Sequence, residues 1–325
     1  MSATEGTPAG TTSSPYPGGA VIVAIVGPTA SGKTTLSLDL AERLGGEIVN
    51  TDAMQVYRGM DIGTAKLPVT ERRGIPHHLL DTQDVREPAT VAAFQGWART
   101  VIAELRGRGA APVLVGGSAL YIRAILDRFD FQATDPEVRA RLEAELAEVG
   151  SESLHRRLTD LDPRTAHTLA PDNGRRIVRA LEVIENTGEP YGSSLPELEY
   201  ADPRTVQVGV DIDRPTLDAR IEQRVHDMYD AGLVAEVEAL LDQGLAEGRT
   251  ASRAIGYREA RSVLAGELDP DEARWRTIYA TRRFARKQMG WWRKDPRITW
   301  VPYDAEDRVE QALAAVQAHS RRPAG

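Results

Sequence analysis

The segment that most constrains the fold is a glycine-rich loop between an apolar run and an amphipathic segment. The loop reads GPTASGKT at residues 27–34 and fits the pattern G-x-x-x-x-G-K-[ST]. The apolar run at 21–26 predicts a buried strand, and the helical spacing of apolar residues over 34–44 predicts a helix. A strand, this loop and a helix in that order predict the first unit of an α/β fold with a mostly parallel sheet.

The loop sequence also predicts a phosphate-binding site. In this arrangement backbone N–H groups and the N-terminus of the following helix surround a phosphate, Lys33 adds a positive charge, and the Thr34 hydroxyl can bind Mg²⁺. Most such loops serve nucleotide hydrolysis or kinase chemistry, so ATP binding is one expectation. The residues predicted to bind phosphates are Gly27, Pro28, Thr29, Ala30, Ser31, Gly32, Lys33 and Thr34.

The residues after a later predicted strand argue against a motor-type ATPase. The apolar run at 112–115 continues into Gly116, Gly117 and Ser118, where the corresponding strand of an ATPase usually supplies an acidic residue. A diphosphate held by amides, a lysine and Mg²⁺ is also easier to expel as a leaving group. The loop therefore leaves open both phosphoryl transfer and diphosphate release.

Strand and helix signals alternate from residue 21 to about residue 130, as in a sheet covered by helices on both faces. The pattern then changes to amphipathic helices, and strand character returns over 206–212. We therefore predict a P-loop NTPase-like core formed by 21–130 and 201–325, interrupted by an all-helical insertion at 131–200.

The two ends of the chain differ in pattern. Residues 1–20 are rich in Ser, Thr, Gly and Pro without apolar periodicity, which predicts a disordered tail. This segment also lacks the basic start of a signal peptide, and no apolar run approaches the length of a membrane span. We expect a cytoplasmic protein with no membrane association. Long helical stretches near 215–243 and 271–293 are expected to complete the core.

Cysteine content and charge narrow the chemistry. The 325 residues include no Cys, which excludes disulfides, thiolate metal sites and cysteine nucleophiles. Any metal is therefore expected to be Mg²⁺ on oxygen ligands. The net charge of −8 argues against a protein that coats nucleic acid, although an average can conceal a local basic patch.

Asp52 is the first candidate for catalysis outside the loop. It stands just past the second predicted strand, so in a parallel sheet it reaches the same edge as the phosphate loop. A carboxylate there can accept a proton or bind Mg²⁺, but it can equally be the N-cap of a helix. His77 and His78 are adjacent on a strand and point to opposite faces, so we interpret them as structural.

Several sequence blocks resemble the bacterial tRNA dimethylallyltransferases, also called tRNA isopentenyltransferases. Beyond the phosphate loop, the resemblance lies in NTDAMQVYRGMDIGTAK at 50–66, PHHLLD at 76–81, LVGGSALYIRAIL at 114–126, DPEVRARL at 135–142, GRRIVRALEV at 174–183, RIEQRV at 220–225, SRAIGYRE at 252–259 and ATRRFARKQMGWWRK at 280–294. The blocks extend over nearly the whole chain from Val21 to about Trp300.

The resemblance implies an enzyme that transfers the prenyl group of dimethylallyl diphosphate to N6 of adenosine 37 in tRNA and releases diphosphate. The phosphate loop would then bind the diphosphate of the donor, with Mg²⁺ on Thr34 and no cleavage of a nucleotide. The catalytic residues implied are Asp52 as general base, with Lys33, Thr34 and Arg220 on the diphosphate. We further expect a monomer.

The resemblance also implies which residues contact tRNA, with the helical insertion gripping the anticodon stem-loop. These are Asp52, Ala53, Met54, Gln55, Ser118, Arg139, Arg175, Arg176, Ile177, Val178, Arg179, Arg253, Ala254, Ile255, Gly256, Tyr257 and Arg258. Ser118 stands where the family usually has threonine, and its hydroxyl is retained.

A basic segment near the C-terminus supports an RNA partner from the residues alone. The window 273–297 has nine basic residues and one acid, hence a local charge of +8. On a helical wheel Arg283 and Lys287 lie opposite an apolar stripe that includes Trp275 and Trp292, which we interpret as core residues. We predict that Arg283 and Lys287 contact RNA phosphates, the alternative being a solvated charged face.

Three other functions remain as alternatives. A related enzyme could prenylate a free adenine nucleotide, but a small acceptor needs neither the insertion nor the basic helix. A small-molecule P-loop kinase is a second alternative, and a non-catalytic RNA-binding protein is a third.

Overall fold

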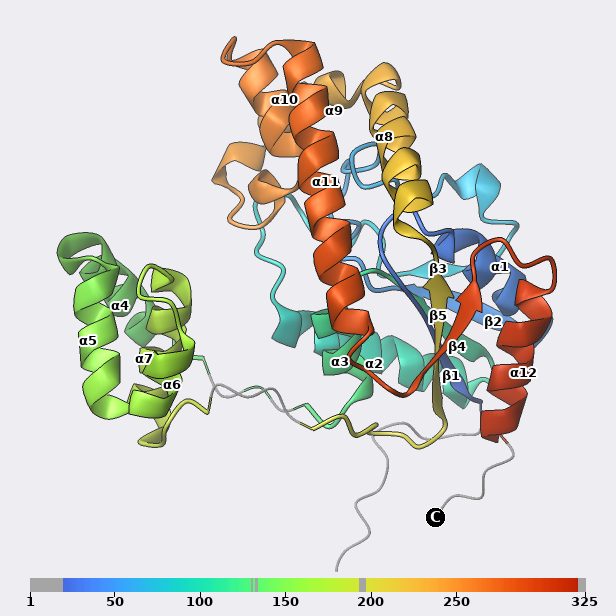
Figure 1. Cartoon of the computed structure of the whole chain (residues 1–325), viewed down its shortest axis with the longest axis horizontal. Helices are drawn as coiled ribbons and strands as arrows, with labels where there is room; N and C mark the ends of the chain where they lie inside the picture. The colour runs from blue at the N-terminus through green and yellow to red at the C-terminus, as the bar shows by residue number, and fades with distance from the viewer. Residues whose placement is uncertain (1–19, 130, 132–133, 193–196, 321–325) are drawn as a thin grey trace, which may run out of the picture. The chain divides into compact units, whose positions relative to one another are not determined.

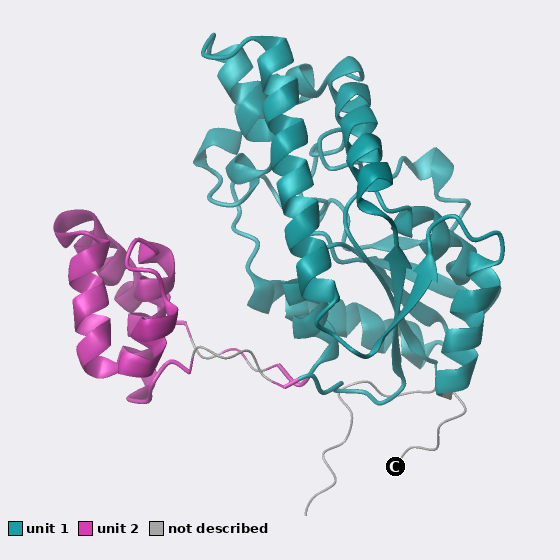
Figure 2. Cartoon of the chain, viewed as in Figure 1, with its two compact units in different colours: residues 1–127, 198–325 teal, residues 128–197 magenta. Residues whose placement is uncertain are grey.

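The chain folds into two compact units. The computed structural model describes residues 20–129, 131, 134–192 and 197–320. The larger unit comprises Met1–Asp127 and Leu198–Gly325, and the smaller unit is Arg128–Glu197, as Figure 2 shows. The predicted disordered tail, apart from residue 20, lies outside the described residues.

The larger unit is built on a six-stranded, all-parallel sheet, which confirms the predicted α/β class. The strand order is β3-β2-β4-β1-β5-β6. The strands are β1 (Ile22–Val26), β2 (Gly46–Asn50), β3 (His77–His78), β4 (Ala111–Val115), β5 (Thr205–Asp211) and β6 (Ile298–Pro302). Every residue of β1 is fully buried, as expected for a central strand covered on both faces.

Alternate residues of β1 face two different hydrophobic cores. Ile22, Ala24 and Val26 pack in one core, whereas Val23 and Ile25 pack in the other. The first core also contains residues of α2 (Val91–Gly107), α3 (Ala119–Leu126), α8 (Arg214–Asp230), α9 (Leu233–Leu241), α10 (Tyr257–Leu264) and α11 (Pro270–Trp292). The second contains residues of α1 (Lys33–Leu44) and α12 (Arg308–Ser320), so these two helices cover the opposite face of the sheet (Figure 1). Three short 3₁₀ segments, η1 (Val69–Glu71), η2 (Leu245–Glu247) and η3 (Ala251–Arg253), lie in connections.

The end of the chain differs from the sequence prediction in two places. The predicted helix at 215–243 is divided into α8 and α9 at Gly232, whose φ of 100° is a left-handed conformation that breaks a helix. Strand β6 and helix α12 follow α11 and were not predicted. Only Ile298 and Val301 of β6 are buried, so this edge strand lacks the continuous apolar run of the inner strands.

The smaller unit contains four helices among its described residues: α4 (Pro136–Val149), α5 (Ser151–Leu161), α6 (Pro163–Thr168) and α7 (Gly174–Thr187). Asp135 and Asp162 cap α4 and α6, each followed by proline at the first helical position. Leu142 and residues from α5 and α7 form a core of their own. Val149, the last residue of α4, is 45% exposed.

The sheet topology places the functional candidates together. Strands β2, β4 and β1 are neighbours and parallel, so the loops that follow Asn50, Val115 and Val26 emerge at one edge. In such sheets this carboxyl edge is where ligands bind. Of the helices in the described ranges, none is both long and apolar enough to span a membrane.

Candidate active site

A cleft of about 210 Å³ lies at the carboxyl edge of the sheet. Its walls combine the phosphate loop, the segment after β2, the glycine pair after β4, and side chains from α8 and α11. The lining residues used below are Thr29, Lys33, Thr34, Asp52, Gln55, Gly116, Gly117, Arg224, Phe284 and Gln288. Segments more than 200 residues apart in the sequence therefore form one site.

The phosphate loop has the backbone conformation that a concave anion site requires. Gly27 has φ of 141°, and a Cβ there would lie only 3.3 Å from the Val210 carbonyl oxygen. Gly32, with φ of 95°, begins α1 without a side-chain cap, so the first N–H groups of the helix remain for a ligand. The predicted loop residues Thr29, Ala30, Ser31, Gly32, Lys33 and Thr34 line the cleft, and Gly27 and Pro28 are buried beneath them.

Lys33 lines the cleft, where the charges of Arg224 and Asp52 act on its ammonium in opposite directions. Its ammonium donates to the Pro28 carbonyl oxygen at 2.5 Å. Burial and, to a smaller extent, the nearby Arg224 charge lower the pKa of Lys33 to about 7, and the charge of Asp52 opposes both effects. A bound anion would favour the charged form of this lysine.

Asp52 follows β2, and hydrogen bonds hold both its backbone and its carboxylate. Asn50 accepts from the Asp52 backbone N–H at 2.9 Å and donates to its carbonyl oxygen at 3.0 Å. The Asp52 carboxylate accepts from the Met54 N–H at 2.9 Å, which caps a turn. No helix starts here among the described residues, so the N-cap alternative is wrong. Burial raises the pKa of the Asp52 carboxyl, whereas the Met54 N–H and Lys33 oppose this rise.

Two arginines of α8 lie beside the phosphate loop: Arg220, which the resemblance implies for the diphosphate, and Arg224, which the sequence analysis did not single out. Arg224 lines the cleft, and its guanidinium donates to the Thr29 hydroxyl at 3.4 Å. Burial and the Arg220 charge lower the pKa of Arg224. Arg220 stacks over the Tyr303 ring at 4.9 Å, and its guanidinium would lie 3.8 Å from a Cβ on Gly32. The i, i+4 spacing within RIEQRV is the signal that could have identified Arg224.

Gln288 of α11 joins two of the loops and was also missed. Its Oε1 accepts from the Thr29 N–H at 2.9 Å, and its Nε2 donates to the Gly117 carbonyl oxygen at 3.0 Å. A Cβ on Gly117 would lie 2.2 Å from that Nε2, and one on Gly116 would lie 2.2 Å from the Thr51 hydroxyl. The glycine pair therefore allows β4, the Asp52 segment and α11 to approach closely.

The other residues after β2 and β4 that were predicted to contact tRNA differ in their burial and in their contacts. Gln55 lines the cleft and donates to the Thr64 carbonyl oxygen at 3.0 Å. Ala53 and Met54 are half-buried beside it, and Met54 packs on the core. Ser118 is half-buried at the start of α3 and is not among the cleft-lining residues. His78 pairs with Glu47 at 2.6 Å, whereas His77 lines the cleft.

The tRNA-contact prediction needs correction for four side chains. Ile177 and Val178 are buried in the core of the smaller unit, and Ala254 and Tyr257 are buried in the larger unit. A side chain enclosed by its own core cannot face RNA, so these residues hold their segments in place. Half-buried Ile255 and buried Gly256 lie between Ala254 and Tyr257.

The arginines of the same segments remain accessible to different degrees. Arg175, Arg176 and Arg253 are exposed. Arg139 and Arg179 both pair with the buried Glu182, and exposed Arg258 pairs with Glu259. Arg139, Arg175, Arg176 and Arg179 belong to the smaller unit, whereas Arg253 and Arg258 belong to the larger unit.

Helix α11 presents a basic and aromatic exposed face. Arg283 and Lys287 are exposed, in agreement with the helical-wheel prediction. Trp292 is buried as expected, but Trp275 is 56% exposed, so its interpretation as a core residue is wrong. Its ring makes an edge contact with His226 near the start of α11, where no element covers it fully. Phe284, on the same helix, is an aromatic wall of the cleft.

Comparisons with known proteins agree on one family. The family model of IPP transferase matches residues 55–295. A tRNA dimethylallyltransferase of Nocardioides sp. is 69% identical over 304 residues, which cover 94% of this chain and 98% of the relative. A tRNA dimethylallyltransferase of Salinispora arenicola is 57% identical, covering 92% of this chain and 87% of the relative.

Solved structures show the same similarity. The tRNA isopentenylpyrophosphate transferase of Bacillus halodurans superimposes with a TM-score of 0.68 at 38% identity, covering 93% of this chain and 98% of that structure. A eukaryotic dimethylallyltransferase, described as acting on tRNA, superimposes with a TM-score of 0.79 at 25% identity. That comparison covers 93% of this chain and 80% of the eukaryotic one.

Proposed function

The chain belongs to the IPP transferase family, and on that premise we propose that it transfers a dimethylallyl group from dimethylallyl diphosphate to N6 of adenosine 37 in tRNA, releasing diphosphate. The observation that carries this proposal is the set of residues that line the cleft. It combines a phosphate loop and half-buried cations with a single carboxylate, that of Asp52, among its described lining residues. Gly116 and Gly117, not an acid, follow β4.

The cations of the cleft suit a diphosphate leaving group. Lys33 belongs to the loop and Arg224 lies beside it, and no carboxylate of the described residues is within ion-pairing distance of Arg224. Negative charge grows on the departing oxygen in the transition state, and fixed positive groups stabilise it there. Arg220, on the same helix, adds to the positive potential, since its charge lowers the pKa of Arg224.

Asp52 supplies the base for the acceptor. The lone pair of adenine N6 is delocalised into the ring, so N6 is a poor nucleophile and becomes cationic as the N–C bond forms. Asp52 then removes a proton from N6 while the C–O bond to diphosphate breaks. A carboxylate whose pKa is raised by burial holds that proton more strongly than an ordinary aspartate.

The residues at the start of α1 fit a bound Mg²⁺. Thr34 is exposed at the mouth of the loop, and no cluster of three or more acidic or histidine side chains in the described ranges could hold a metal alone. Mg²⁺ usually retains several waters and binds through one or two protein oxygens plus phosphate oxygens. The Thr34 hydroxyl would hold it, and when bound it neutralises charge on the diphosphate.

The acceptor must leave its base stack to reach Asp52. Enzymes that modify a base take it out of the stack into a pocket, and unpaired loops are where proteins read RNA sequence. Exposed Arg283 and Lys287 on α11 and exposed Arg175 and Arg176 on α7 are the candidates for phosphate contacts. We infer a monomer that acts in the cytoplasm.

Transfer of radiolabelled prenyl diphosphate tests the proposal directly. The enzyme is incubated with the labelled donor and, in parallel, with undermodified tRNA, AMP or ATP. Label in tRNA at adenosine 37 is the expected result. Label in AMP or ATP would indicate a nucleotide prenyltransferase, and consumption of the ATP γ-phosphate with no transfer would indicate a kinase.

A further inference from the structure

Two charged side chains outside the cleft hold the segment that carries Asp52 and Gln55. We call residues 51–66, between β2 and Leu67, the Asp52 loop. Lys66 at its end and Glu236 on α9 both bind this loop, and neither lines the cleft. Neither residue has a part in the chemistry described above.

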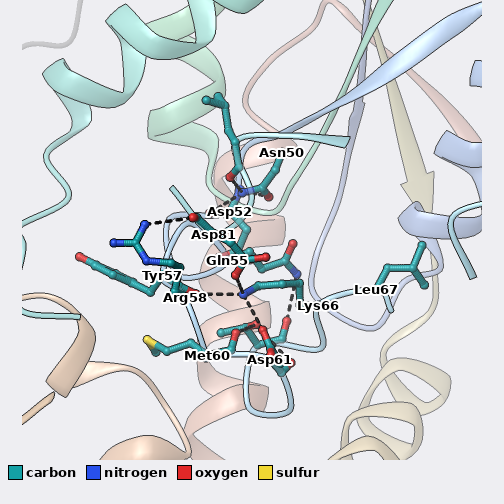
Figure 3. A network of polar contacts seen from close by, with 12 residues as sticks. Asn50, Asp52, Gln55, Tyr57, Arg58, Met60, Asp61, Lys66, Leu67 and Asp81 are labelled. Carbon is teal, nitrogen blue, oxygen red and sulfur yellow. Dashed lines mark hydrogen bonds and ion pairs between the residues drawn. The ribbon is translucent and has the colours of Figure 1, made fainter. Parts of the chain in front are cut away.

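The Lys66 ammonium is buried at the centre of the loop, with only 3% of its side chain exposed. It contacts the Asp81 carboxylate at 2.5 Å, the Asp61 carboxylate at 2.6 Å and the Tyr57 carbonyl oxygen at 2.9 Å (Figure 3). An ammonium has three N–H donors, so all three are used. Lys66 thereby joins two points of the Asp52 loop to the segment that follows β3.

That segment also contacts the loop through its backbone. The Asp81 N–H donates to the Gln55 carbonyl oxygen at 3.3 Å, and the Gln83 N–H donates to the Val56 carbonyl oxygen at 2.9 Å. Asn50 donates to the Leu79 carbonyl oxygen at 2.9 Å while it holds the Asp52 backbone. Asp81 therefore links Lys66 to Gln55, because its carboxylate binds the ammonium while its N–H binds the Gln55 carbonyl oxygen.

Glu236 holds the opposite side of the loop. Its carboxylate accepts from the backbone N–H groups of Asp61, Ile62 and Gly63 at 3.1, 2.7 and 3.3 Å. It also accepts from the Tyr257 hydroxyl at 2.5 Å. Burial and the charge of Glu236 raise the pKa of Tyr257, so this hydroxyl remains a donor. Hydrogen bonds to a charged group are stronger than neutral ones.

Close packing at Gly63 explains why a glycine stands where Glu236 binds the loop. A Cβ on Gly63 would lie 2.3 Å from the Tyr257 ring and 2.8 Å from Leu233. The glycine of DIGTAK and the tyrosine of AIGYRE therefore meet, and no other residue fits at position 63 without displacing the ring. Two sequence blocks about 190 residues apart form one structural unit around Glu236.

The phosphate loop is fixed by different residues. Gln288 binds the Thr29 N–H, and Lys33 binds the Pro28 carbonyl oxygen. Among the described residues, Lys66 and Glu236 make no hydrogen bond to this loop, and their partners all lie in the Asp52 loop, at Asp81 or at Tyr257. The donor and acceptor sides of the cleft are thus supported separately.

We propose that Lys66 and Glu236 are positioning residues for the acceptor side of the reaction. They fix the Asp52 loop so that Asp52 and Gln55 meet the adenosine, and they leave diphosphate binding unaffected. This inference rests on the proposed function. A reacting group displaced by about 1 Å can lose on the order of 10²-fold in rate, so a loosened loop should lower turnover without loss of donor affinity.

The test uses Lys66→Met and Glu236→Gln with matched controls. Arg73→Met removes a cation from an exposed pair with Asp39, and Glu238→Gln makes the same change at an exposed position of the same helix. For each variant we would measure kcat, KM for an anticodon stem-loop RNA, and the Kd of inorganic diphosphate by calorimetry. Amide hydrogen exchange of residues 51–66 and 27–34 supplies a readout without catalysis.

We expect kcat to fall by roughly 10²-fold in Lys66→Met and less in Glu236→Gln, with the diphosphate Kd equal to that of the controls. Exchange should accelerate at 51–66 and not at 27–34. Turnover and exchange equal to the controls would overturn the inference, as would a loss of diphosphate affinity parallel to kcat. Should Lys66→Met fail to fold, Glu236→Gln decides by the same criteria. An inactive wild type would refute the proposed function, whereas hydrogen exchange would separately show whether Lys66 and Glu236 fix the Asp52 loop.

Discussion

Replacing Asp52 by Asn separates its catalytic role from its structural one. The side chain has two functions in the structure: its carboxylate lines the cleft, and it accepts from the Met54 N–H at 2.9 Å. An asparagine Oδ1 can still accept that bond, so the turn should persist. What is lost is the negative charge and the ability to take a proton from N6.

The expected loss follows from what a positioned base contributes. General base catalysis is typically worth about 10²- to 10⁴-fold, or roughly 3–5 kcal/mol of activation free energy. We therefore expect kcat for Asp52→Asn to fall by that factor, while the affinity for tRNA stays near that of the wild type. Diphosphate binding should not weaken through charge repulsion, because the variant removes a negative charge from the cleft.

The pH dependence gives a second, independent criterion. The base is active when deprotonated, and burial raises the pKa of the Asp52 carboxyl above its ordinary value. Activity should therefore decline as the pH falls through this raised pKa, and the acid limb of kcat/KM should lie above that of an exposed aspartate. The Asp52→Asn variant should lack this limb.

The assay is transfer of labelled dimethylallyl into an anticodon stem-loop RNA across a pH series, under single-turnover conditions. Asp307→Asn, the same change at an exposed position, is the control. Turnover of Asp52→Asn within about threefold of the control would refute the assignment of the base, because a positioned base contributes at least about 10²-fold. Persistence of the acid limb in the variant would refute it as well.

Three further predictions concern the cations. The pKa of Lys33 is about 7, and its charged form binds anions. Diphosphate affinity, measured by calorimetry, should therefore fall as the pH rises through about 7 in the wild type. This pH dependence should be absent in Lys33→Met. Arg224→Gln should weaken diphosphate binding by roughly 10- to 100-fold, as expected for the loss of a hydrogen bond to a charged group. This effect should exceed that of Arg220→Gln. A larger effect of Arg220→Gln would show that Arg220, the residue implied by the sequence, is the main arginine on the diphosphate. The double variant Arg283→Ala/Lys287→Ala should lower the salt dependence of tRNA affinity by about one unit of slope per phosphate contact, and an unchanged slope would exclude these residues from the interface.

The sequence predicts the part of the site that contiguous segments build. The strand, glycine-rich loop and helix at 21–44 follow from local rules, because glycine placement and apolar periodicity act within a few residues. The position of Asp52 follows from the same rules, since the carboxyl ends of parallel strands share an edge. The resemblance drawn from the sequence blocks agrees with the family found by comparison.

Helix periodicity alone was less reliable at the surface. It correctly predicted that Trp292 is buried and that Arg283 and Lys287 are exposed. It failed for Trp275, which lies on the apolar side of the wheel but has no element that covers it fully. A helical wheel shows which residues share a face, whereas burial depends on the length of the neighbour packed against that face.

The tertiary structure decided which distant side chains complete the site. Gln288 reaches Thr29 across 259 positions, and Arg224 reaches the same residue across 195. Glu236 binds a loop more than 170 positions away. Local sequence fixes the conformation of a short segment, because sterics and backbone hydrogen bonds act between near neighbours. The packing of α8, α9 and α11 against the sheet determines which side chains reach the cleft or the Asp52 loop, and that packing depends on the whole hydrophobic core.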